Sequence, residues 1–97
     1  MPFAIILAPE AVEDRKRLKA SVWAAVRDAV EAHLRHAPTR TSRSRIERLR
    51  GMARPQYRLR VGEVRVFYDV AGSTVEILAI VAKSEVLSWL AQFGSRE

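Results

Sequence analysis

The chain has 97 residues, of which 48% are hydrophobic and 29% charged, and it contains no cysteine. This length supports one hydrophobic core, so we expect a single domain over residues 1–97. The composition excludes a disordered chain, a disulfide-stapled scaffold and a thiolate metal site. The apolar runs are too short for a signal peptide or a membrane span, so we expect a cytoplasmic protein without a membrane role.

The formal net charge of +6 is concentrated in one segment of the chain. Residues 1–39 carry a net charge of +1 and residues 66–97 carry −2, whereas residues 40–65 carry +7. The planar guanidinium of arginine can bind two phosphate oxygens at once and can stack on a base. We therefore predict a nucleic-acid contact, with a solvated surface or a site for an acidic protein segment as alternatives. The arginines of this segment are Arg40, Arg43, Arg45, Arg48, Arg50, Arg54, Arg58, Arg60 and Arg65.

The first forty residues predict a strand followed by a helical hairpin. Residues 3–7 are apolar and rich in branched side chains, which favours a short buried strand. Pro9 and the acids after it indicate the start of a helix that ends near Leu18. An apolar stripe then recurs at four-residue spacing on a second helix, which ends at Pro38. The stripe consists of Val22, Val26, Val30 and Leu34.

The second half of the chain predicts an antiparallel meander. Residues 39–45 are polar and predict a loop, and Ile46 begins a strand. Residues 57–61 and 64–68 alternate around a tight turn at Gly62, which is typical of a β-hairpin. A second turn at residues 71–73 leads into an apolar strand over residues 74–82. Ser84 is expected to cap a last helix that ends at Gly94.

Together these elements predict an α+β fold. The N-terminal strand and helical hairpin should pack on the antiparallel meander, with helices on one face of the sheet and a short C-terminal helix. We expect Tyr57, Tyr68 and Trp89 to serve in packing rather than chemistry. His33 and His36 are expected to be cations at a helix end, and neither a metal nor another cofactor is predicted.

The hairpin places several arginines on one face of the sheet. If Val61 pairs with Val64, then Arg60 lies opposite Arg65, and Arg58 lies opposite Phe67. Like charges directly opposed on paired strands are destabilising, so this arrangement favours an anionic ligand. The alternative is that the arginine stems cover the sheet while their charged ends remain in water.

Three segments carry a resemblance to a known family. Leu49-Arg50-Gly51-Met52, Tyr57-Arg58-Leu59-Arg60-Val61-Gly62 and Val64-Arg65-Val66-Phe67-Tyr68-Asp69-Val70 resemble the central signature of the RelE/ParE superfamily, the toxins of type II toxin-antitoxin systems. Residues 83–86 extend the similarity. For the RelE branch, the resemblance implies cleavage of messenger RNA in the ribosomal A site, by attack of a ribose 2′-hydroxyl on the neighbouring phosphate.

The resemblance also implies site residues. The candidate catalytic residues are Arg58, Arg60, Arg65 and Lys83, which would suit a phosphate clamp. Arginine is a poor general base, so proton transfer would fall to Lys83, with an exposed structural lysine as the alternative. The other arginines of the basic segment are candidates for RNA binding, namely Arg43, Arg45, Arg48, Arg50 and Arg54.

Three functions follow from this resemblance. The first is a ribosome-dependent mRNA endonuclease that inhibits translation. The second is a ParE-like gyrase inhibitor without nuclease chemistry, because Leu87 stands where ribosome-dependent members often place tyrosine or histidine. The third is a non-toxic member that binds only antitoxin and nucleic acid. The expected partners are a cognate antitoxin, in a hetero-oligomer with the toxin, and the ribosome with its mRNA.

Overall fold

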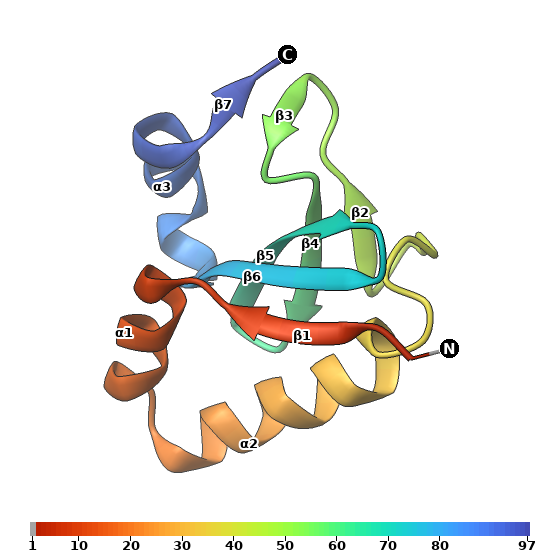
Figure 1. The fold of residues 1–97 in the computed structure, drawn as a ribbon. Coiled ribbons are helices and arrows are strands. Elements are labelled where there is room, and N and C mark those ends of the chain that lie inside the picture. The colour runs from red at the N-terminus through yellow and green to blue at the C-terminus, as the bar shows by residue number, and fades with distance from the viewer. Residues whose placement is uncertain (1) are drawn as a thin grey trace.

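The computed structural model describes residues 2–97 and places a five-stranded sheet at its centre (Figure 1). The strand order is β1-β6-β5-β4-β2, and all neighbours are antiparallel except β1 and β6. This arrangement confirms the predicted meander of β4, β5 and β6. The strands are β1 (Ala4–Leu7), β2 (Ile46–Arg48), β4 (Tyr57–Val61), β5 (Val64–Ala71) and β6 (Thr74–Ala82), with β3 (Met52–Arg54) and β7 (Ser95–Arg96) paired separately.

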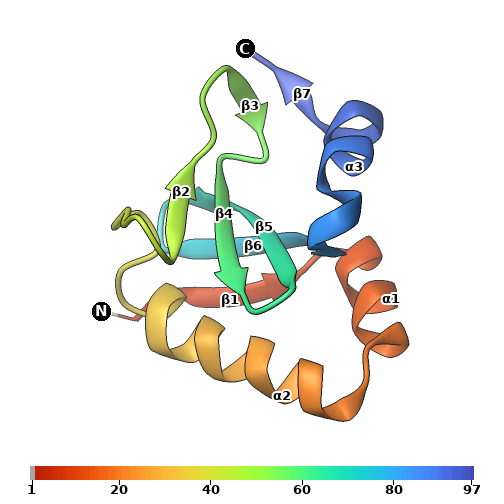
Figure 2. The ribbon, with the colours of Figure 1, turned by 180° about the vertical axis from the view of Figure 1, so that it is seen from behind.

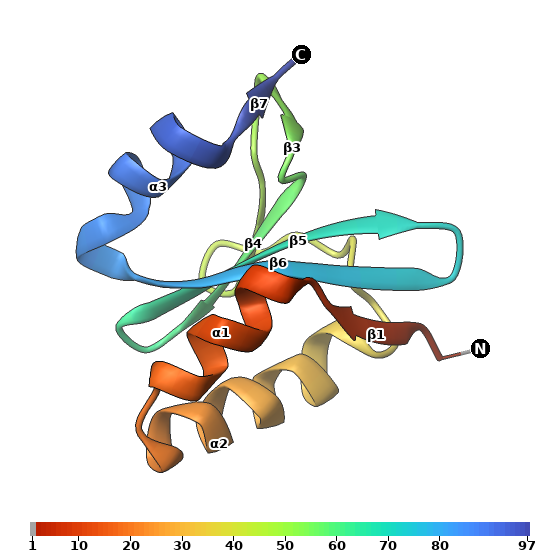
Figure 3. The same cartoon turned by 60° about the vertical axis from the view of Figure 1, so that its left-hand side comes forward.

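The predicted helical hairpin covers one face of the sheet (Figure 3). It consists of α1 (Pro9–Arg17) and α2 (Ala20–Ala29), which continues into the π-helical turn η1 (Val30–Leu34). The apolar stripe of the second helix packs on this face, where Val26 and Leu34 are fully buried against Leu59 and Val66. No helix within residues 2–97 is both long enough and apolar enough to cross a membrane.

The C-terminal helix α3 (Val86–Phe93) covers the opposite face, so the expectation of helices on one face is wrong for this element. Because side chains alternate along β5, Phe67 faces away from the helical hairpin. Its ring is fully buried, so another element must pack over it. Trp89 on α3 does so, because the two rings stack at 4.7 Å between centroids with an interplanar angle of 8°. This stacking confirms the packing role expected for Trp89.

The start of α3 also differs from the prediction. Ser84 does not cap this helix but lies within a short 3₁₀ turn, η2 (Lys83–Glu85), and Glu85 occupies the position before α3 without a capping side-chain bond. The end of α3 at Gly94 is as expected.

Tyr68 on β5 forms a hydrogen bond to the residue that precedes the arginine-rich loop, residues 39–45. Its side chain is fully buried, and its hydroxyl donates a hydrogen bond of 2.6 Å to the carbonyl oxygen of Pro38. Burial raises the pKa of the Tyr68 hydroxyl, and the nearby Tyr57 adds to this shift. Because Pro38 directly precedes the exposed loop 39–45, this bond fixes the point from which the loop departs.

We expect Tyr68→Phe to lower the free energy of unfolding by about 1 to 3 kcal/mol, because it leaves the buried Pro38 carbonyl without its donor. Chemical denaturation followed by circular dichroism would measure the change. Tyr57→Phe is the matched control, since that ring is only partly buried, and it should change stability less. Equal stability of Tyr68→Phe and the wild-type protein would contradict the role given to this hydroxyl.

Candidate nucleic-acid interface

The hairpin register brings the predicted arginines onto one face. Val61 pairs with Val64, Arg60 lies opposite Arg65, and Arg58 lies opposite Phe67. Gly62 opens the two-residue turn with a φ of 55°, a left-handed conformation that glycine adopts without strain. Because Phe67 packs under α3, the three arginines lie on the face opposite the helical hairpin.

Arg65 is buried in the turn rather than exposed. Its side chain is 5% accessible, and its Nη1 donates to the carbonyl oxygens of Gly62 and Val64, both at 2.9 Å. Burial lowers the pKa of this guanidinium, and the positive charges of Arg60 and Arg58 lower it further. Arg65 therefore stabilises the turn through these two hydrogen bonds, and its charge adds to the positive potential around Arg58 and Arg60.

Glu47 on β2 forms an ion pair with Arg58 on β4. The two residues are direct cross-strand partners, which explains why their side chains meet. The sequence analysis did not predict Glu47 as a residue of this site. An acidic residue on an expected strand, within a segment that contains nine arginines, could have indicated it. Its carboxylate offsets part of the repulsion between neighbouring arginines.

The arginine-rich loop folds back onto β4 beside β2 (Figure 2). The amide of Arg60 donates to the carbonyl oxygen of Arg45 at 2.8 Å. Ser42 Oγ accepts hydrogen bonds from the amides of Arg45 and Ile46 at 3.1 and 3.4 Å, which closes the loop. These bonds bring loop arginines next to strand arginines.

The result is a hollow of about 140 Å³, which we call the arginine hollow. Four of the nine predicted site residues line it, and three of these, Arg43, Arg45 and Arg60, are exposed. Several arginine side chains around one hollow are suited to phosphate oxygens, which guanidinium groups bind by charge-assisted hydrogen bonds. The lining residues are Ser42, Arg43, Arg45, Ile46, Glu47, Arg58 and Arg60.

The other predicted residues lie outside the arginine hollow. Arg48 donates to the carbonyl oxygens of Leu49 and Gln56 at 2.8 and 2.9 Å. Arg54 lies 3.3 Å from Asp69 and 3.2 Å from Glu76 in ion pairs. Arg50 and Lys83 are both exposed, and the amide of Lys83 donates to the carbonyl oxygen of Glu63 at 2.8 Å.

No group of three histidine, aspartate or glutamate side chains within residues 2–97 is placed to hold a metal ion. His36 is exposed, whereas His33 is partly buried at the end of the second helix and lines a neighbouring hollow together with Arg40 and Arg45.

Comparison with known proteins shows the family to which this chain belongs. Residues 5–87 match the family model of the ParE toxin of the type II toxin-antitoxin system parDE. The chain therefore belongs to the ParE toxin family, within the RelE/ParE superfamily of type II toxins. No curated protein matches the chain.

Solved structures with the same fold include three RelE-type proteins. In the archaeal RelE-RelB complex from Pyrococcus horikoshii OT3, the similar chain has 20% identity and a TM-score of 0.70, with 86% of this chain and 97% of that chain covered. In the RelBE2 complex from Mycobacterium tuberculosis, the similar chain has 24% identity and a TM-score of 0.69, and 84% of this chain and 99% of that chain are covered. A mutant of E. coli RelE in the free state has 21% identity and a TM-score of 0.68, and 95% of this chain and 97% of that chain are covered.

We expect Glu47→Gln to strengthen binding to a polyanion, because it removes the carboxylate that pairs with Arg58 and leaves the guanidinium available. Elution from heparin should require a higher salt concentration than for the wild-type protein. Asp28→Asn on α2 is the control of equal charge change, and its shift should be smaller. Equal shifts for both variants would indicate a net-charge effect and not a site.

Proposed function

We propose that this toxin is a ribosome-dependent endoribonuclease that binds messenger RNA at the arginine hollow. The observation that carries the proposal is the convergence of Arg43 and Arg45 from the loop with Arg58 and Arg60 from β4. Four arginine residues around one hollow suit the backbone of a single-stranded RNA, whose phosphates they would hold.

In this proposal a ribose 2′-oxygen forms a bond to the neighbouring phosphorus while the bond to the 5′-oxygen of the next nucleotide breaks, which leaves a 2′,3′-cyclic phosphate. The departing 5′-oxygen takes a proton from water, and the arginines neutralise the charge that develops on the phosphoryl oxygens. Arg65 supports the turn beneath Arg60 and contributes charge without touching the substrate. Lys83 lies outside the hollow, whereas Glu47 lines it and can accept a proton. Binding of a phosphate to Arg58 would release the Glu47 carboxylate from its ion pair for that task.

The partner that we propose is an antitoxin. The similar chains from P. horikoshii and M. tuberculosis were solved as toxin-antitoxin complexes.

A second candidate function is inhibition of gyrase by binding alone. Leu87 is 84% exposed on α3, and it gives this surface an apolar side chain where ribosome-dependent members often place an aromatic or histidine. The family model that the chain matches is also that of the ParE toxin.

The test is inducible expression in bacteria of the wild-type protein and the double variant Arg43→Ala/Arg60→Ala. Both side chains are exposed, so the variant should fold. The control Lys19→Ala/Arg27→Ala removes the same charge from the helical hairpin. Growth and primer extension on translated messages are followed together. We expect arrest with cut messages for the wild-type protein and the control, and neither for the variant.

Arrest with intact messages would contradict the nuclease and favour the gyrase inhibitor. Absence of arrest by the wild-type protein would leave a non-toxic member that binds antitoxin and nucleic acid.

A further inference from the structure

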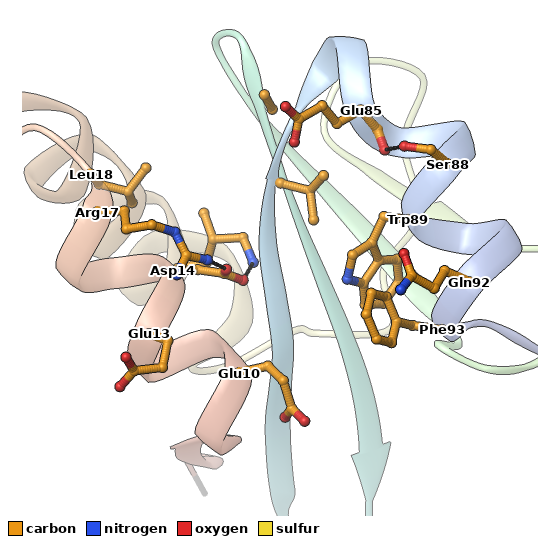
Figure 4. A pocket seen from close by; sticks show the side chains of 13 residues that line it. Glu10, Glu13, Asp14, Arg17, Leu18, Glu85, Ser88, Trp89, Gln92 and Phe93 are labelled. Atoms are coloured by element: carbon orange, nitrogen blue, oxygen red, sulfur yellow. Dashed lines mark hydrogen bonds and ion pairs between the residues drawn. The ribbon is translucent and has the colours of Figure 1, made fainter.

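A groove of about 510 Å³ lies between α1 and α3 across the end of β6 (Figure 4), and it shares no lining residue with the arginine hollow. Apolar side chains from both sides line it, among them Leu18, Trp89 and Phe93. Phe93 is 55% exposed, an unusual exposure for so large an apolar side chain. An ionic margin surrounding an apolar interior is typical of a surface that binds another protein.

The charge of this groove is opposite to that of the protein as a whole. Four acids line it against one cation, Arg17, which is itself paired with Asp14 at 2.5 Å. Glu10 and Glu85 lie at opposite ends of the groove in Figure 4. On a chain of net charge +6, this acidic groove repels nucleic acid and attracts a cationic ligand.

The groove also runs along an open edge of the sheet. β1 pairs with β6 only as far as Ile77, whereas β5 pairs with β6 as far as Ala82. Beyond Ile77, β6 therefore has no second strand beside it within residues 2–97. The backbone amide of Ile80 on this edge donates a hydrogen bond of 2.9 Å to the Asp14 carboxylate. This side chain thus replaces the carbonyl oxygen that a neighbouring strand would supply.

Beyond Phe93 the groove continues into a second hollow of about 300 Å³. The two hollows share Glu10, Trp89 and Phe93, and the second is also lined by the buried Leu78 and by Arg54, which is paired with Asp69 and Glu76. A site that extends past both sides of an exposed aromatic ring is shaped for a length of polypeptide rather than for a compact small molecule.

We propose that this groove binds a segment of the antitoxin in which apolar residues alternate or cluster with lysine or arginine. The proposal rests on the antitoxin partnership given under Proposed function. Apolar side chains of the segment cover Phe93 and Leu18, and its cations lie beside Glu10 and Glu85. The antitoxin is thereby held at a site distinct from the arginine hollow, and it can be bound without occupying the surface that holds RNA.

The test measures the affinity of the purified toxin for the antitoxin encoded beside its gene, at a series of salt concentrations. The charge reversal Glu10→Lys/Glu85→Lys changes two exposed side chains of the groove. The control Asp28→Lys/Glu97→Lys makes the same charge change elsewhere, and Phe93→Ala removes the exposed ring. We expect at least tenfold weaker binding for the groove reversal, a clear loss for Phe93→Ala, and less than threefold change for the control.

Binding of single-stranded RNA by the same proteins separates this site from the arginine hollow, and it should not be weakened by the groove variants. A benzophenone cross-linker at Gln92 should capture an antitoxin peptide that contains lysine or arginine beside apolar residues. Unchanged antitoxin affinity in the groove variants, or capture of an acidic peptide, would overturn the groove assignment and leave the toxin function intact. Failure of the wild-type protein to bind the antitoxin would instead remove the partnership itself.

Discussion

The pairing of β4 with β5 across the turn at Gly62 is the constraint on which the rest of the structure depends. This register sends Val66 and Tyr68 toward the helical hairpin and sends Phe67 toward α3. Because side chains alternate along a strand, a slip of one residue would exchange the two faces and bury the arginines of β4 in the main core. This one register therefore determines which residues form the main core, which residues pack under α3 and which arginines form the basic surface.

The cost of this register is the close approach of positive charges, and the fold offsets that cost locally. Arg65 is held by two carbonyl oxygens, and Arg58 by Glu47 across the strand pair. Arg60 is left exposed beside the loop arginines. Like charges directly opposed on paired strands destabilise the pair, and departures from local stability of this kind are expected at functional sites, which supports the anionic ligand that we propose. In our proposal, the acidic groove between α1 and α3 and the arginine hollow bind different partners because their charges are opposite.

The sequence was sufficient to predict the α+β fold, the meander and the pairing of Arg60 with Arg65, because these follow from alternation and a short turn. It was not sufficient for the side of the sheet that α3 covers, since the amphipathic pattern of α3 does not specify its partner. Nor could it separate Arg48 and Arg54 from the hollow, because partners of Arg54 lie far along the chain at Asp69 and Glu76. The role of Glu47 depends on the pairing of β2 with β4, which the short strand did not reveal.

The central claim is that the arginine hollow binds RNA phosphates, and the salt dependence of RNA affinity tests it most directly. The dissociation constant of a single-stranded RNA oligonucleotide would be measured over a range of salt concentrations for the wild-type protein and for Arg43→Ala/Arg60→Ala. If each arginine holds one phosphate, the slope of log affinity against log salt should fall in magnitude by about 1.4, roughly 0.7 for each phosphate that is no longer held. An unchanged slope and affinity would contradict the account, because the hollow would then not be where RNA binds.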